Sequence, residues 1–92
     1  MATKTKHTAG NDVLNAAERH SLKDSDFGLP SKREFPMPDA AHVRAAEAYF
    51  RYASEGDKPE LAHRILQKAH KFGVEVDSET ILGWAGKHKD FR

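Results

Sequence analysis

The chain has 92 residues, a length that suits one small domain, and 38% of them are hydrophobic. Its 15 basic and 14 acidic side chains leave a formal net charge of +1, which argues against a protein dedicated to binding a polyelectrolyte. The chain has no cysteine, which excludes disulfide scaffolds, thiolate metal sites and thiol nucleophiles, and gives secretion no support.

The chain begins with a polar segment that has nothing to bury. Residues 1–10 are small, polar and basic, and we expect them to form a disordered arm. We expect residues 11–92 to form a single helical domain with its core within 27–88. A first helix is predicted over Asp12–His20, and because it is so short it needs a partner surface to be stable.

A proline-rich segment, Phe27–Pro38, follows, and we call it the strap. Its prolines favour extended conformations at the residues before them and forbid a central strand. The strap is therefore predicted to be extended coil, with an edge strand as the alternative. We expect Phe35 to seat between the following helices, and Arg33 to pair with a helix carboxylate such as Glu47.

Two longer helices are predicted next, each with a start signal. Asp39 is a good N-cap for a helix over Ala40–Ser54. Asp57 precedes a proline in the first turn of a helix over Pro59–Phe72, which Gly73 ends. The short connection predicts an antiparallel pair.

A last short helix, capped by Asp77 or Ser78, is predicted to run to about Lys87. The predicted fold class is all-α: a helical hairpin with an extended strap before it and a short helix after it.

The histidines do not have the spacing of a metal site. His63 and His70 are separated by about two helical turns, roughly 10 Å along the axis, so one ion cannot bridge them. His42 falls in the first turn of a predicted helix, where a structural role is favoured over a catalytic one. Phosphate-binding loops and nucleophile elbows are absent from the sequence. We therefore predict no enzyme, no metal and no cofactor, and keep a hydrolase built on His42 as a distant alternative.

Three aromatic residues are candidates for contact with a protein partner or, by self-assembly, with further copies of the chain: Tyr49, Tyr52 and Trp84. Interface hot spots favour tyrosine and tryptophan, although packing in the core or at its rim is the plainer explanation for each.

The sequence has no apolar run near the roughly 20 residues that a membrane span needs, so no membrane contact is expected. The alternative is a nucleic-acid interface on the helix over residues 59–72, with cations from the chain end, made of Arg64, Lys68, Lys71, Lys87 and Lys89.

The strap and the helix after it carry a resemblance to a known family. Phe27-Gly28-Leu29-Pro30, Arg33-x-Phe35-Pro36, Asp39-x-x-His42-Val43-Arg44-x-Ala46 and Phe72-Gly73-Val74 are similar to a small domain common in bacteriophage and prophage genomes, which has no settled function. The resemblance covers about Leu22–Val76 and carries over no catalytic residue. It implies a phage-encoded accessory or virion-associated structural protein, located in the host cytoplasm or in the virion. With the aromatic candidates, it makes a non-enzymatic protein-interaction module the leading prediction.

Overall fold

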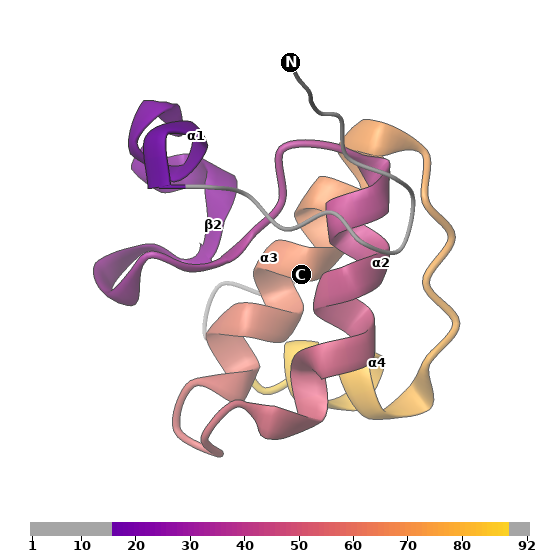
Figure 1. Ribbon diagram of the computed structural model, residues 1–92. Helices are drawn as coiled ribbons and strands as arrows, with labels where there is room; N and C mark the ends of the chain where they lie inside the picture. The colour runs from indigo at the N-terminus through magenta and orange to yellow at the C-terminus, as the bar shows by residue number, and fades with distance from the viewer. Residues whose placement is uncertain (1–15, 89–92) are drawn as a thin grey trace.

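The computed structural model describes residues 16–88 (Figure 1). The predicted arm at residues 1–10, part of the first predicted helix and Lys89 lie outside the described residues. The elements are given in chain order, with η for a 3-10 helix. They are α1 (Ala16–Ser21), η1 (Asp24–Asp26), β2 (Phe27–Leu29), η2 (Pro30–Lys32), β3 (Glu34–Pro36), α2 (Ala40–Tyr49), η3 (Phe50–Tyr52), α3 (Lys58–Phe72) and α4 (Glu79–Ala85).

The all-α prediction is wrong, because the strap folds as a β-hairpin beside the helices. Strands β2 and β3 pair antiparallel, with Phe27 opposite Pro36 and Leu29 opposite Glu34. The Met37 N–H donates to the Asp26 carbonyl at 2.7 Å, just beyond the first pair. Phe27 and Pro36 are therefore a pair that exchanges no hydrogen bonds, and the missing N–H of proline removes none from the ladder. The fold is mostly helical with a small sheet.

The turn between the strands is made without glycine. The chain passes through η2 and then through Arg33, which is left-handed at φ 51° and ψ 48°. Phe35 also has a positive φ, of 59°. Such angles are uncommon for residues with a side chain and persist only where surrounding contacts hold them.

The Arg33 side chain provides such contacts, although not with Glu47 as predicted. Its guanidinium donates to Asp24 Oδ1 at 2.7 Å and to the Arg19 carbonyl at 2.8 Å. It also lies 4.5 Å from the centre of the Phe27 ring. The arginine thereby ties α1, η1 and β2 to the hairpin turn. Sequence reasoning placed its partner on a helix, whereas the nearer carboxylate is in the turn before the strap.

The predicted antiparallel helix pair is confirmed, with shifted ends. Asp39 caps α2, since its side chain accepts from the His42 N–H at 2.9 Å. Helix α2 ends at Tyr49 rather than Ser54, and the chain tightens into η3. Helix α3 begins at Lys58, and the Asp57 side chain makes no capping hydrogen bond to it.

The end of α3 and the start of α4 follow the predicted signals. Gly73 is left-handed at φ 72°, and the Val74 N–H donates to the Ala69 carbonyl at 2.8 Å. Ser78 caps α4 by accepting from the Ile81 N–H at 3.2 Å. Helix α4 lies at the end of the pair where α2 finishes and α3 begins (Figure 1).

The core lies where the hairpin and α4 pack against the helix pair. Met37, which directly follows β3, is fully buried. Phe35 packs against the core but stays partly exposed. Burying each large apolar side chain stabilises the fold by about 1.5–3 kcal/mol relative to exposure. The largest fully buried side chains come from β2, its partner segment, α2 and α3: Phe27, Met37, Val43, Leu61 and Ile65.

Candidate interaction surface

Two tyrosines stand exposed at the end of α2. Tyr49 is 60% exposed and Tyr52 is 67% exposed, and their ring centres are 6.1 Å apart. Arg51 lies 4.8 Å from the Tyr52 ring centre and donates to its hydroxyl at 3.0 Å. The change from α-helix to η3 buries Phe50 while it leaves both tyrosines in solvent. We call Tyr49, Arg51 and Tyr52 the tyrosine patch.

The third aromatic candidate, Trp84, is half-buried against the core. The Lys87 Nζ is 4.6 Å from its ring centre and the Lys58 Nζ is 5.8 Å from it. Lys58 also lies 5.8 Å from the centre of the Phe50 ring. Lys58, in the first turn of α3, therefore lies near both the Trp84 ring and the buried Phe50 ring of η3.

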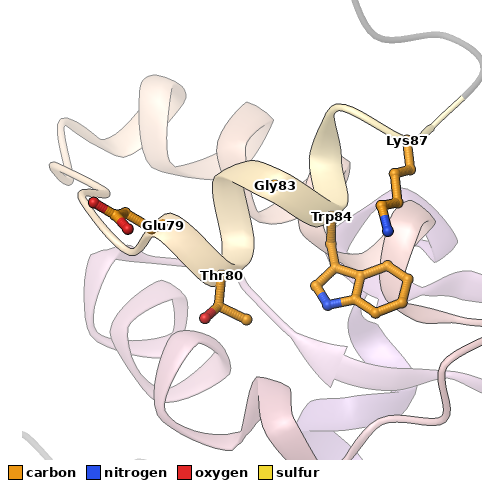
Figure 2. Close-up of a pocket in the computed structure, with 5 residues that line it drawn as sticks. All are labelled: Glu79, Thr80, Gly83, Trp84 and Lys87. Carbon is orange, nitrogen blue, oxygen red and sulfur yellow. The ribbon is translucent and has the colours of Figure 1, made fainter.

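Beside Trp84, α4 carries a shallow hollow of about 240 Å³, which we call the α4 hollow (Figure 2). Gly83 is one of its lining residues, and nothing lies within 4 Å of the position where a Cβ would stand. In Figure 2, Trp84 and Lys87 extend from the same side of α4, and Glu79 is at the other end of the helix. The lining residues are Glu79, Thr80, Gly83, Trp84 and Lys87.

The predicted basic face of α3 is partly neutralised within the chain. Arg64 pairs with Glu60 at 3.1 Å, one helical turn away. The Lys68 Nζ lies 3.6 Å from a carboxylate oxygen of Asp26, in η1. Lys71 lies 5.3 Å from the centre of the Phe72 ring. Two of the three helix cations predicted to contact phosphates, Arg64 and Lys68, are thus paired with carboxylates, whereas Lys71 has a ring contact alone.

The cations around the aromatic residues differ in this respect. Within residues 16–88, no carboxylate lies within ion-pair distance of Arg51, Lys58 or Lys87. Sequence reasoning named Lys87 for nucleic acid and missed Arg51, Lys58 and Gly83. The signal for Gly83 was present, because a glycine inside a helix costs about 1 kcal/mol relative to alanine.

His42 is a structural residue of the helix start. It is 5% exposed, and its Nδ1 lies 2.7 Å from Asp39 Oδ1, the oxygen that also caps the helix. Its Nε2 is buried and has no hydrogen-bond partner within the described part of the chain. The same carboxylate thus holds both the backbone and the ring of His42.

Metal and membrane features are not found in the part of the chain that the structure describes. Among residues 16–88, no three side chains of histidine, aspartate or glutamate gather as they would around a metal ion. None of the helices described is both long and apolar enough to span a bilayer.

The chain was compared with curated proteins, solved structures and family models. No curated protein and no solved structure matches the chain. A family model described as a family of unknown function, DUF6582, matches residues 3–79 and so extends beyond the segment that carries the strap motif. Since the match spans most of the sequence, the chain belongs to this family of unknown function, DUF6582.

Proposed function

We propose that the protein is a non-enzymatic interaction module that binds a protein partner through the tyrosine patch. The observation that carries this proposal is the exposure of Tyr49 and Tyr52 side by side, with Arg51 against one ring. Tyrosine and arginine are the residues that most often dominate the binding energy of interfaces. A small domain that has few large apolar groups gains nothing for its own core from two tyrosines left in solvent.

The environment of His42 supports a non-enzymatic role. A general base must reach the proton that it removes, at hydrogen-bond distance from a substrate. The Nε2 of His42 is buried, and the Nδ1 is occupied by Asp39.

The strap motif supports the biological setting. Its resemblance to a domain of phage and prophage genomes favours a phage-encoded accessory or virion-associated protein, in the host cytoplasm or in the particle. Mass spectrometry of purified particles tests this setting: the chain is expected at a fixed ratio to the capsid protein. Its absence from the particles would leave only the accessory role.

Photocrosslinking tests the interaction itself. We expect a benzophenone amino acid at Tyr52 to yield a discrete protein adduct in native cells, whereas the same group at the exposed Glu75 does not. Adding Tyr49→Ala to the Tyr52 probe should abolish the adduct while the melting temperature stays unchanged, because the Tyr49 ring is largely in solvent. Equal labelling from both positions would refute the proposal.

A further inference from the structure

The α4 hollow is a second feature of the surface, distinct from the tyrosine patch. We propose that it binds one apolar side chain of an acidic peptide segment, whose carboxylates pair with Lys58 and Lys87. This inference rests on the proposed function, since it names the chemical class of the protein partner and the place where its anchor residue sits.

The shape of the hollow is the first argument. Its volume, about 240 Å³, corresponds to the space of roughly eight water molecules, enough for one large side chain. Gly83 and Trp84 both belong to the lining, and Figure 2 shows the indole extending from α4. An apolar side chain placed there would contact the indole and the backbone of the glycine.

The charges around the hollow identify the flanking residues of the partner. Lys87 lines the hollow and lies 4.6 Å from the centre of the Trp84 ring. Lys58 does not line the hollow, but its Nζ lies 5.8 Å from the centre of the same ring. Within residues 16–88, neither lysine has a carboxylate at ion-pair distance. Carboxylates brought by a partner would complement these cations, and such complementarity fixes both register and choice of partner.

A protein segment fits this surface better than a nucleic acid. Glu79 lines the same hollow, and it would repel a continuous phosphate backbone laid along α4. A peptide can place its carboxylates at the lysine end alone and present an uncharged residue to Glu79.

Fluorescence anisotropy with defined peptides tests the proposal on the full chain. The probe is a short fluorescein-labelled peptide of glutamates around one leucine. Two matched peptides replace the leucine by alanine, or the glutamates by lysines. We expect the Glu/Leu peptide to bind about tenfold more tightly than either one, because the leucine adds apolar contact and the glutamates complement the lysines.

Gly83→Leu gives a variant that blocks the hollow without harming the fold. Its side chain enters open space, and replacing an exposed helix glycine should raise the melting temperature. We expect at least about a tenfold loss of Glu/Leu peptide affinity in this variant. Gln67→Leu, at an exposed position of α3, is the matched control and should bind as wild type. Lys87→Glu should lose binding, and Lys71→Glu should retain it.

Three results would overturn the proposal: equal affinity of the leucine and alanine peptides, unchanged binding by Gly83→Leu, or tighter binding of a thymidine oligonucleotide than of the acidic peptide. The crosslink from Tyr52 separates this inference from the proposed function. If that adduct forms equally in Gly83→Leu, the protein is an interaction module whose partner does not use the hollow. If the adduct is absent while the Glu/Leu peptide binds, the hollow is a peptide site and the tyrosine patch is not its counterpart.

Discussion

Among the glycines that the structure describes, Gly28, in the middle of β2, has the least room for a side chain. A Cβ built there would stand 2.5 Å from Leu61 Cδ1 and 3.1 Å from both Met37 Cε and Phe35 Cβ. The absence of a side chain therefore lets the hairpin approach α3 closely enough to bury its neighbours. Close packing thus accounts for the glycine of the Phe-Gly-Leu-Pro motif.

Gly28→Ala is expected to lower the free energy of unfolding by about 1–3 kcal/mol, as overpacking of a tight core does. Urea denaturation measures this change. Gly56→Ala is the matched control, because nothing lies within 4 Å of its added Cβ and its φ is not positive. A Gly28→Ala variant as stable as Gly56→Ala would show that Leu61 and Met37 move aside at little cost.

Local signals of single residues could be predicted from the sequence. Asp39, Ser78 and Gly73 perform their expected roles because a helix cap or stop depends only on neighbours within one turn. Pairings between distant residues could not be predicted. Nothing in the sequence places Lys68 beside Asp26, since that contact exists only after the hairpin has docked on α3.

At the scale of elements, the β-hairpin was the main feature that sequence reasoning missed. The proline rule was applied correctly to a central strand, but a sheet of two strands has only edges. The turn also lacked its usual signal, because Arg33 rather than glycine or asparagine takes the left-handed conformation. The end of α2 was misplaced for a related reason: apolar periodicity continues into Phe50 although the backbone has already tightened.

The contacts of Arg33 predict how α1 is held. Arg33→Lys keeps the charge but cannot bond Asp24 and the Arg19 carbonyl together, so α1 should loosen from the hairpin. We expect faster amide hydrogen exchange in α1 and a loss of about 1 kcal/mol in unfolding free energy.

Arg33→Gly provides the control for the backbone. Glycine removes the guanidinium and relieves the left-handed strain at this position, while it adds conformational entropy to the unfolded chain. Faster exchange confined to α1 would therefore report the lost guanidinium contacts. Exchange rates in α1 that match wild type in both variants would mean that Arg33 does not hold this helix.

Across the whole molecule, ionisable groups contribute with opposite signs to the pH dependence of stability. Burial, followed by the nearby charge of Asp77, raises the pKa of Glu47 above its usual value of 4.5. Hydrogen bonds from Lys32 and then Ser54 lower the pKa of Asp57 below its usual value of 3.8. Ionised Glu47 therefore opposes folding, and ionised Asp57 favours it.

Glu47→Gln should make the protein more stable at neutral pH. A carboxyl whose folded pKa is raised loses stability as the pH rises from its unfolded pKa through its folded pKa. The gain from glutamine should therefore be absent below pH 4.5 and grow above it. Unfolding free energies measured across this range check the sign.

Asp57→Asn serves as the opposite case. The loss of stability caused by this substitution should be largest above pH 3.8. It should disappear as the pH falls below the lowered folded pKa of Asp57, because the wild-type carboxyl is then protonated in both its folded and unfolded states. The same pH dependence for the two variants would contradict the proposed causes of both shifts.

The surface could be predicted only in part. Tyr49 and Tyr52 were identified as candidates by residue type and spacing, and the structure leaves them exposed. The hollow beside Trp84 was not predicted, because it depends on a missing side chain at Gly83 and on how α4 turns toward α3. Side-chain types are visible in a sequence, whereas the empty space between them is not.

The position of Trp84 has a spectroscopic consequence. It is the single tryptophan of the chain, and it lies where α4 meets the first turn of α3, with two lysine ammonium groups beside its ring. Excitation at the red edge of indole absorption therefore reports on one place in the molecule. Emission from the unlabelled protein can follow the detachment of α4 during unfolding. It can also follow the filling of the hollow when the peptide is added. Rapid mixing of the protein with denaturant, or with the peptide, would give the rate of each event.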